Sequence, residues 1–357
     1  YLNEITPEGK PPAVSVEATL LGQELRSDWD YGAENMSKPL RLLSLDGGGV
    51  RGISSLYILK DIMSKITGDP NAKPCDYFDM MAGSTSIGGL IAIMPGRLRM
   101  SIDKCIEAYR HEMAADIFGA DGLEKLDNAS DTGAMYSGKV LENSVKKLVK
   151  QYTGDHDAPM RGPNDECKVF VLNCTADDIS NIVATHFRTY INKNTDKTFA
   201  DYKIWEVARA TSAAPGYFPR IKLGEHRWWS RLQQPNPPCD LLGEAHLNYR
   251  LARPIGCVVT LGTGMNPNIA LPDTSSIALG KSVAPDLFER WFGSYERTIE
   301  KYTPENWAQV TIALDDYKAM DHFGMLTQEY MKTEVDKAQT AAAKLPPRRF
   351  PLSTVKQ

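Results

Sequence analysis

The hydrophobic positions along the chain fall into short continuous runs that alternate with runs at helical spacing. The first continuous run, Leu40–Leu45, predicts a buried strand, because a strand covered on both faces contains few polar positions. The run leads into glycines at 47–49, after which apolar residues recur three or four positions apart as far as Gly68. We therefore expect a strand, a glycine loop and an amphipathic helix that ends at Gly68.

The same order of elements recurs directly downstream. The apolar run Tyr77–Ala82 predicts a second strand, and a serine-containing turn, Ser84–Gly89, leads from it into an apolar helix. Pro95 is expected to stop that helix, because proline lacks the amide that a helix interior needs. Both turns stand where a strand gives way to a helix, which is where ligands collect in parallel sheets.

The rest of the chain continues the alternation. Residues 119–133 are expected to form a loop, and the chain from Pro285 onward is expected to be mostly helical. The other predicted elements are helices near 102–109, 140–149 and 204–211, and strands at 169–172, 182–190 and 257–261. Alternating strands and helices indicate an α/β fold with a central, largely parallel sheet.

Length and composition favour one large domain with appendages. The chain has 357 residues, of which 42% are hydrophobic and 24% charged, enough to bury one sizeable core. Residues 1–38 are rich in Pro, Gly, Glu and Ser with little period, and they predict an extended N-terminal arm. We expect the α/β domain over 39–270 and a mostly helical C-terminal extension, 271–357, packed on that domain.

Charge and cysteine content narrow the partners and the compartment. A formal net charge of −4 gives no electrostatic basis for nucleic acid as the main partner. The six cysteines have no C-x-x-C spacing and sit mostly in apolar patterns, as free thiols do, which suits a reducing compartment such as the cytoplasm. No apolar run approaches the roughly 18 residues of a membrane span. No signal peptide is visible, and the start at Tyr1 indicates a trimmed terminus.

The two turns carry the candidate chemistry. Adjacent glycines at Gly47, Gly48 and Gly49 let backbone amides approach a ligand, so the loop can hold a phosphate or an oxyanion. In the second turn, Ser86 stands where a nucleophile elbow exposes its serine, although Ser84 replaces the usual first glycine. A plain loop or helix cap is the simpler interpretation of that serine. The glycine loop fits neither common nucleotide-binding motif.

Together, the glycine loop Asp46–Gly52 and the serine turn resemble the patatin-like phospholipase family, whose loop has the pattern D-G-G-G-x-R-G. The resemblance covers Leu40 to about Gly264. Segments similar to fungal members are Tyr77–Asp79, Gly89–Ala92, Arg209–Pro215 and Gly262–Gly264, with a fainter likeness at Leu314–Tyr317. The resemblance implies a three-layer α/β/α fold and no metal or other cofactor. The site residues it implies are Ser86 as nucleophile, with Gly47, Gly48, Gly49 and Arg51 as the oxyanion hole.

The third part of the family's site, an aspartate that acts as general base, does not carry over. Counted forward from Trp228 and back from Asn236, the position of that aspartate is held by Ser230. A serine hydroxyl cannot serve as a base near neutral pH. The resemblance therefore implies a site whose base is missing or displaced.

Two displaced bases are considered. Asp240 could reach the site if the proline-rich segment shifts register, although its simpler role is to cap a helix over 241–245. His226 could form a Ser-His pair foreign to the family, although a surface histidine is the simpler interpretation. A weaker alternative combines Ser86 and Asp240 with His246 or His322.

The expected function is that of a serine acyl hydrolase or acyltransferase acting on a lipid or another hydrophobic ester. Two alternatives stay open: a catalytically impaired, lipid-binding protein, and a repurposed enzyme that acts on a hydrophobic metabolite. Asp315 and Asp316 are expected to form a turn or cap, and no oligomeric state follows from the sequence. A stripe at helical spacing predicts core, an acyl-pocket wall or peripheral membrane contact; it comprises Leu287, Phe288, Trp291, Tyr295 and Ile299.

Overall fold

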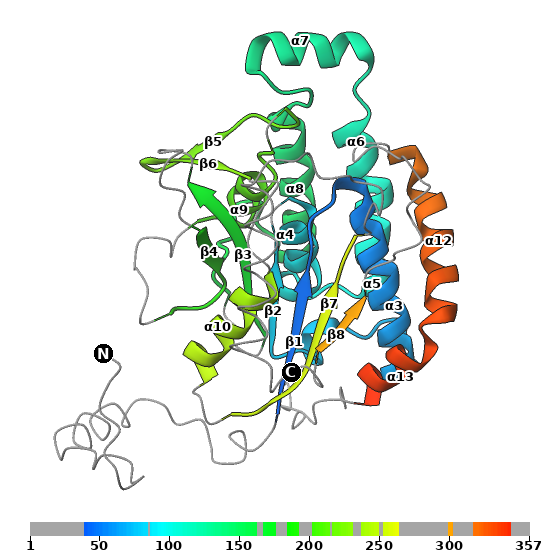
Figure 1. Ribbon diagram of the computed structural model, residues 1–357. Helices are drawn as coiled ribbons and strands as arrows, with labels where there is room; N and C mark the ends of the chain where they lie inside the picture. The colour runs from blue at the N-terminus through cyan, green and yellow to red at the C-terminus, as the bar shows by residue number, and fades with distance from the viewer. Residues whose placement is uncertain are drawn as a thin grey trace, which may run out of the picture. The chain divides into compact units, whose positions relative to one another are not determined.

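The computed structural model describes residues from Pro39 onward (Figure 1). The described residues are 39–84, 86–162, 167–175, 184–192, 202–214, 216–230, 237–249, 253–263, 299–302 and 317–343. The expected arm at 1–38, the stripe residues from Leu287 to Tyr295, and the pair Asp315 and Asp316 lie outside these ranges.

A sheet forms the centre of the unit that the described residues make up. In its described part it has eight strands in the order β5-β6-β3-β2-β1-β7-β8, with β4 paired to β3. The strands are β1 Leu40–Leu45, β2 Met80–Gly83, β3 Lys168–Thr175, β4 Ala184–Arg188, β5 Ile221–Leu223, β6 His226–Trp229, β7 Ile255–Leu261 and β8 Ile299–Tyr302. The pairings from β3 through β2, β1 and β7 to β8 are parallel, and the pairings of β4, β5 and β6 are antiparallel. The sheet is therefore largely parallel, as the sequence predicts.

Helices pack on both faces of the sheet. The described helices are α3 Ile53–Thr67, α4 Ile87–Ala92, α5 Ile102–Glu107, α6 Ala114–Phe118, α7 Gly122–Thr132, α8 Gly138–Thr153, α9 Ile204–Thr211, α10 Pro237–Tyr249, α12 Met320–Thr333 and α13 Val335–Ala343. The helix α3 ends at Gly68, whose φ of 64° is the left-handed cap that the sequence predicts. Both α12 and α13 pack on α3. The described residues 317–343 of the C-terminal region are therefore mostly helical, whereas Ile299–Tyr302 form the strand β8 of the sheet.

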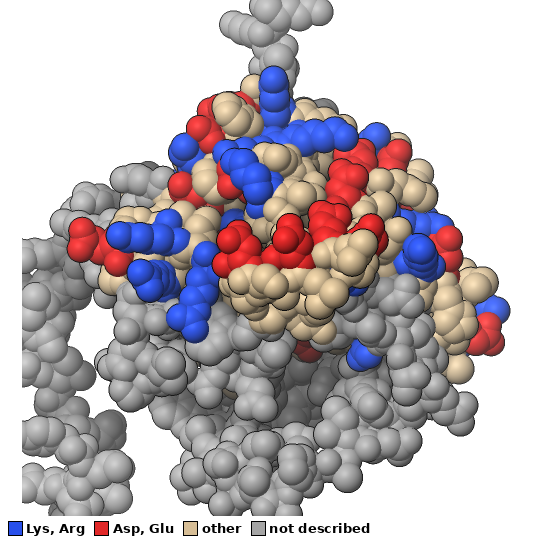
Figure 2. Space-filling model, turned by 90° about the horizontal axis from the view of Figure 1, so that it is seen from above, with Lys and Arg blue, Asp and Glu red and all other residues tan. Residues whose placement is uncertain are grey.

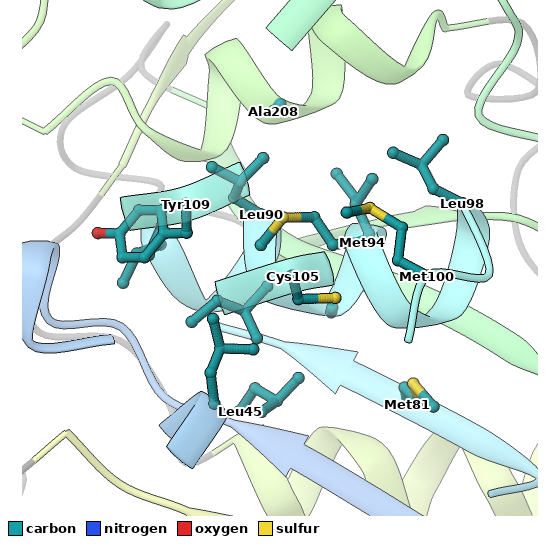
Figure 3. Packing of buried hydrophobic residues seen from close by; sticks show 14 of the residues in the cluster. Leu45, Met81, Leu90, Met94, Leu98, Met100, Cys105, Tyr109 and Ala208 are labelled. Carbon is teal, nitrogen blue, oxygen red and sulfur yellow. The ribbon is translucent and has the colours of Figure 1, made fainter. Parts of the chain in front are cut away.

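Each face of the sheet has its own hydrophobic core, because successive strand residues point to opposite faces. In β1, Leu43 and Leu45 belong to the larger core with α3, α4, α5, α8 and α9, whereas Leu40 and Leu42 pack with Leu241 of α10. Figure 3 shows part of the larger core, where strand and helix side chains fill the same space. These two cores confirm the three-layer α/β/α fold.

The structure differs from the expectation at Pro95. The helix does not stop there, because Ile93–Arg97 forms one π-helical turn that continues α4. A turn with i→i+5 bonding changes which amides are needed, and it can therefore include a residue without one. Pro95 is buried in this turn together with Ile93 and Met94, and this burial favours the helical course.

The prediction of a loop at 119–133 is wrong, because Gly122–Thr132 forms the helix α7. The carboxylate of Asp121 caps the helix by accepting a 2.9 Å hydrogen bond from the amide of Glu124, and Gly133 ends it with a φ of 73°. None of the residues of α7 is buried. Its two large apolar residues, Leu123 and Leu126, stand three positions apart among polar residues, and so short a pattern did not predict a helix.

Two further differences concern the start of β2 and the kind of element that contains Ile299. The strand β2 starts at Met80 rather than Tyr77. Ile299 does not lie on a helical face, because it pairs with Val258 in the parallel register of β8 with β7. Its β-branched side chain suits an extended backbone, and the hydrogen bonds offered by β7 override the helical spacing.

Candidate functional site

The glycine loop that follows β1 is held by neighbouring side chains through its carbonyl oxygens. Thr263, just beyond β7, donates from Oγ1 to the carbonyl oxygen of Gly47 at 2.7 Å. The buried Tyr109 donates its hydroxyl to the carbonyl oxygen of Gly49 at 3.0 Å, and burial raises the pKa of that phenol well above its usual range. Among the described residues, no backbone group accepts from the amides of Gly47, Gly48 and Gly49. The loop thus keeps its donors available while its carbonyls are engaged.

The fit at Gly48 excludes any other residue. A Cβ atom there would lie 2.2 Å from Oγ1 of Thr263, the group that holds the loop. The amide of Asp46 donates to the carbonyl of Leu261 at 3.0 Å, so β1 and β7 stay joined up to the loop. The position of the loop is therefore set by the end of β7.

Ser86 occupies a strained turn between β2 and α4. Its φ is 66° and its ψ is −132°, and Ser86 and Arg99 are the residues other than glycine with positive φ in the described chain. The amide of Ser86 donates to the carbonyl oxygen of Thr211, at the end of α9, over 2.6 Å. Strain of this kind persists only where the surroundings impose it, and it is typical of a nucleophile elbow.

Close packing of the backbone accounts for the glycines around Ser86. A Cβ at Gly83 would lie 2.5 Å from the carbonyl oxygen of Gly88, and a Cβ at Gly88 would lie 2.6 Å from that of Leu45. A Cβ at Gly89 would lie 2.5 Å from Cγ1 of Val171. The first turn of α4 can approach the strands this closely only without side chains.

The glycine loop and the serine turn lie side by side at the carboxyl ends of the neighbouring strands β1 and β2. Leu45 and Gly83, the last residues of β1 and β2, are partners in the parallel register. The amide of Ser84 donates to the carbonyl oxygen of Leu45 at 2.8 Å, which extends the pairing to the start of both turns. A serine nucleophile next to free backbone amides is the arrangement that acyl transfer requires.

Ser230 lies at the end of β6 and is almost fully buried, with 1% of its surface exposed. Its amide donates to the carbonyl oxygen of Ala213 at 3.0 Å, two residues beyond the carbonyl that holds Ser86. Its hydroxyl has no hydrogen-bond partner within the described ranges. The backbone amides of both serines are thus bonded to one short segment, Thr211–Ala213, at the end of α9. The side chain at position 230 is a hydroxyl rather than a carboxylate.

Asp240 does not cap a helix over 241–245, because α10 begins at Pro237 and Asp240 lies in its first turn. Its Oδ1 is 3.2 Å from Nε2 of His186 in β4. The helix α10 packs on one face of the sheet, and α4, which follows Ser86, packs on the other. The described contacts therefore connect Asp240 with His186 and not with Ser86.

The contact with Asp240 belongs to a buried charged cluster that sequence reasoning missed. Nε of Arg188 donates to Oε2 of Glu244 at 2.9 Å, and the hydroxyl of Tyr190 donates to the same oxygen at 2.6 Å. Burial disfavours the charge of Glu244, but hydrogen bonds from Arg188 and His186 outweigh it and hold its pKa well below the usual range. Burial also opposes the charge of His186, yet its bonds to Asp240 and Glu244 prevail and raise its pKa. The cluster ties β4 to α10.

The other residues singled out from the sequence lie as follows. His226 is exposed at the start of β6, with its ring centroid 6.0 Å from that of Trp228. Arg51 lies in the helical turn after the glycine loop, and its amide donates to the carbonyl oxygen of Gly48 at 3.1 Å. His322 is exposed on α12, and His246 is partly buried on α10. The structure therefore gives no described contact that joins Ser86, Asp240 and either histidine into a triad.

No metal centre or membrane span is found in the part of the chain that the structure describes. Within those residues, no group of three or more His, Cys, Asp or Glu side chains could hold a metal ion. No described helix is both long and apolar enough to cross a membrane. The described cysteines that form no disulfide are Cys75, Cys105, Cys167, Cys239 and Cys257.

Two residues that hold the loop were not recognised as such from the sequence. Tyr109 counted only as one apolar position of a helix, and Thr263 only as part of a Gly-Thr-Gly segment after a strand. The position of Thr263, at the end of a strand parallel to β1, was the available signal. Nothing in the sequence near Tyr109 indicates its contact with Gly49.

Comparison with known proteins identifies relatives. The family model described as patatin-like phospholipase matches residues 43–230, more than half of the chain. Calcium-independent phospholipase A2-gamma of Oryctolagus cuniculus is 31% identical over 232 residues, which cover 63% of this chain and 28% of that protein. Phospholipase A I of Arabidopsis thaliana is 26% identical over 316 residues, covering 74% of this chain and 24% of the relative.

A third relative is named as probably inactive. Probable inactive patatin-like protein 9 of Arabidopsis thaliana is 30% identical over 190 residues, covering 51% of this chain and 46% of that protein. The chain thus spans less than half the length of each of these three relatives. The match to the family model over most of the α/β core shows that the chain belongs to the patatin-like phospholipase family.

Proposed function

We propose that the chain is a serine acyl hydrolase or acyltransferase of lipid esters, with Ser86 as its nucleophile. The observation that carries this proposal is the strained turn at Ser86, with a φ of 66°, beside a loop whose amides have no backbone acceptor among the described residues. Those amides, from Gly47, Gly48 and Gly49, form the proposed oxyanion hole. The phospholipase names of two relatives support a lipid ester as the substrate.

In the proposed first step, Oγ of Ser86 attacks the carbonyl carbon of the ester, and its proton is transferred to the oxygen of the departing alcohol. The carbonyl oxygen becomes an oxyanion that the amides of the glycine loop stabilise, with Arg51 adding positive charge. The C–O bond of the ester then breaks, and the alcohol leaves with a proton while the acyl group stays on Ser86. Water releases a fatty acid in hydrolysis, and a second alcohol takes the acyl group in acyl transfer.

The general base of this mechanism is missing or displaced. Ser230 stands where the family has its aspartate, and Asp240 is engaged with His186. A positioned base contributes on the order of 10²- to 10⁴-fold, whereas oxyanion stabilisation and binding leave roughly 10³- to 10⁴-fold over water. The proposed enzyme is therefore slow, unless Asp240 or His226 moves to Ser86.

Ser230 also favours a second candidate function, a catalytically impaired protein that binds lipids without turning them over. The buried hydroxyl of Ser230 has no hydrogen-bond partner in the described chain, so nothing there replaces the aspartate. One relative is itself named as probably inactive. A repurposed enzyme that acts on a hydrophobic metabolite is the third candidate, in which the loop polarises a carbonyl and Ser86 forms no covalent bond.

A fluorophosphonate probe separates the first candidate from the other two, because it reacts only with an activated serine. The wild-type chain should be labelled, and Ser86→Ala should abolish the label. Ser84→Ala is the matched control, since Ser84 lies in the same turn and should leave the labelling intact. A folded wild-type protein that takes no label contradicts the hydrolase proposal and favours the impaired or repurposed protein.

Location and domain boundaries complete the proposal. Free thiols support a reducing compartment, and we place the protein in the cytoplasm, peripheral to membranes. The packing of α12 and α13 on α3 supports a C-terminal extension, 271–357, that belongs with the α/β domain of 39–270. We also propose that residues 1–38 form an N-terminal arm that precedes the α/β domain.

A further inference from the structure

The helix α7 exposes apolar side chains to solvent. None of its residues is buried. Leu123 and Leu126 keep 79% and 67% of their surfaces exposed, the largest fractions among the large hydrophobic residues of the described chain. Two leucines three positions apart lie on the same face of a helix, so they form one continuous patch. Such a pair is unusual on a helix whose other positions are mostly polar.

The side of α7 that faces the rest of the protein is its polar side. The side-chain amide of Asn128 donates to the carbonyl oxygen of Met135 at 3.3 Å. The ammonium group of Lys125 lies 4.8 Å from the ring centroid of Tyr136. An ordinary surface helix turns its apolar face inward. Here polar residues hold the helix and the leucines are left on the outside, which indicates a partner for them beyond the described unit.

The base of α7 is joined to the segment that holds the proposed active site. After α7 the chain pairs with residues 216 and 217, where the amide of Met135 donates to the carbonyl of Gly216 at 2.9 Å and that of Tyr136 to Tyr217 at 2.9 Å. This segment follows directly on the carbonyls of Thr211 and Ala213. Figure 1 shows α7 at the end of the unit toward which β1 and β3 point. The helix that carries the leucine patch therefore lies on the side of the unit to which the carboxyl ends of the strands, and the turn with Ser86, belong.

We propose that Leu123 and Leu126 dock on the surface of zwitterionic phospholipid. This inference rests on the proposed function, because a lipid surface is where an enzyme that cleaves lipid esters meets its substrate. A stable protein interface buries roughly 800 Å² on each partner, and two leucine side chains supply only a small part of that. A lipid surface needs no complementary shape and takes up small apolar patches.

The negative charge of α7 favours zwitterionic over anionic lipid. Its acidic residues are Glu124, Asp127 and Asp131, with Asp121 as the cap, and its one basic residue, Lys125, lies over Tyr136. Figure 2 shows this end of the unit from above, with acidic side chains in a row beside uncharged ones across the middle of the view. Helices that dock on anionic membranes are rich in Lys and Arg. An acidic helix is repelled by such membranes, and a zwitterionic surface leaves its apolar face free to insert.

The test is co-sedimentation of the full chain with phosphatidylcholine vesicles. Leu123→Ser combined with Leu126→Ser should lower the vesicle partition coefficient by about tenfold, since both inserting side chains are lost. The matched control is Leu247→Ser combined with Met325→Ser, which removes two other exposed hydrophobic residues, with 55% and 62% exposure, from α10 and α12. The control should bind vesicles as the wild type does.

Three outcomes overturn the inference. The first is that the Leu123/Leu126 variant binds vesicles as well as the wild type does. The second is that the wild type binds only vesicles that contain phosphatidylserine. The third is that the wild type is a dimer without vesicles and that the same variant is a monomer. Fluorophosphonate labelling of Ser86 in the absence of lipid is measured on the same samples. If Ser86 is labelled but binding does not depend on the leucines, only the docking proposal is contradicted. If binding depends on the leucines but Ser86 takes no label, only the hydrolase proposal is contradicted. Unchanged thermal unfolding of the variants shows that the fold is intact.

Discussion

The amide of Ser86 donates a 2.6 Å hydrogen bond to the carbonyl oxygen of Thr211 at the end of α9. This bond comes from outside the turn, and it helps to hold Ser86 at a φ of 66°. A residue other than glycine in such a conformation costs on the order of 1–3 kcal/mol. The geometry of the proposed nucleophile therefore depends on α9 and on the glycines around the turn as much as on the serine itself.

Gly88→Ala should disrupt this turn. A Cβ at position 88 would lie 2.6 Å from the carbonyl oxygen of Leu45, a backbone atom that cannot rotate away. We expect urea unfolding to show a loss of about 1–3 kcal/mol, the usual cost of overpacking, and fluorophosphonate labelling of Ser86 to fall. Gly243→Ala is the control, because nothing lies within 4 Å of that position in α10. It should stabilise the chain by roughly 0.5–1 kcal/mol. Full labelling of Gly88→Ala would contradict the close packing described for α4.

Tyr109→Phe should loosen the glycine loop. The change removes the hydroxyl that donates to the carbonyl oxygen of Gly49 and leaves the ring in the core. We expect a loss of about 1 kcal/mol in urea unfolding, the usual net worth of one hydrogen bond, together with slower fluorophosphonate labelling. Tyr152→Phe on α8 is the matched control and should change neither measurement. If labelling of Tyr109→Phe keeps the wild-type rate, the loop does not need this contact.

Ser230→Asp should raise the turnover of a short-chain p-nitrophenyl ester. The amide of Ser230 bonds to the carbonyl of Ala213, two residues from the carbonyl that accepts from Ser86, so an aspartate at position 230 would be attached to the same short segment of the chain. A restored base should contribute up to roughly 10²- to 10⁴-fold. Ser230→Asn, which has the shape of aspartate without its charge, is the control and should stay slow. Equal rates for the two variants would mean that position 230 is not the site of the base.

Much of the fold could be predicted from the sequence, because its signals are local. The run Leu40–Leu45, the glycines that follow it and the cap at Gly68 each have one favourable backbone solution. The turn at Ser86 was predicted for the same reason, since Gly88 and Gly89 mark a close approach of helix and strand. The fold class follows from the order of these elements.

The parts that the sequence did not predict depend on contacts between distant residues. The helix α7 has only two large apolar residues, Leu123 and Leu126, and both are exposed, so no buried stripe marks the helix in the sequence. The π-helical turn at Pro95 is held by burial in the core. Glu244 and Arg188 are far apart in the chain, and only the packing of α10 on the sheet brings them together. Propensity and spacing contain no information on such pairs.

Glu244→Gln should destabilise the chain strongly. Glu244 and Arg188 are both largely buried, with side-chain exposures of 3% and 13%, and their contact is supported by Tyr190. Removal of one charge from a buried pair leaves the other uncompensated, which costs about 3–5 kcal/mol. Glu329→Gln on α12, where the pair with Lys332 is exposed, is the control and should cost about 0–1 kcal/mol. A loss as small for Glu244→Gln would show that water reaches the cluster.

His186→Gln should change how stability depends on pH. Because the folded state raises the pKa of His186, the charged ring contributes stability that is fully present below its unfolded pKa of about 6.5 and is lost as the pH rises through the raised value. The wild type should therefore lose stability in urea unfolding as the pH rises from about 6 through the neutral range. His186→Gln should flatten this part of the profile, whereas His322→Gln, at an exposed position on α12, should leave it unchanged. The same slope in His186→Gln as in the wild type would mean that Arg188, which lies 2.8 Å from Nδ1 of the ring, keeps His186 neutral in the folded state.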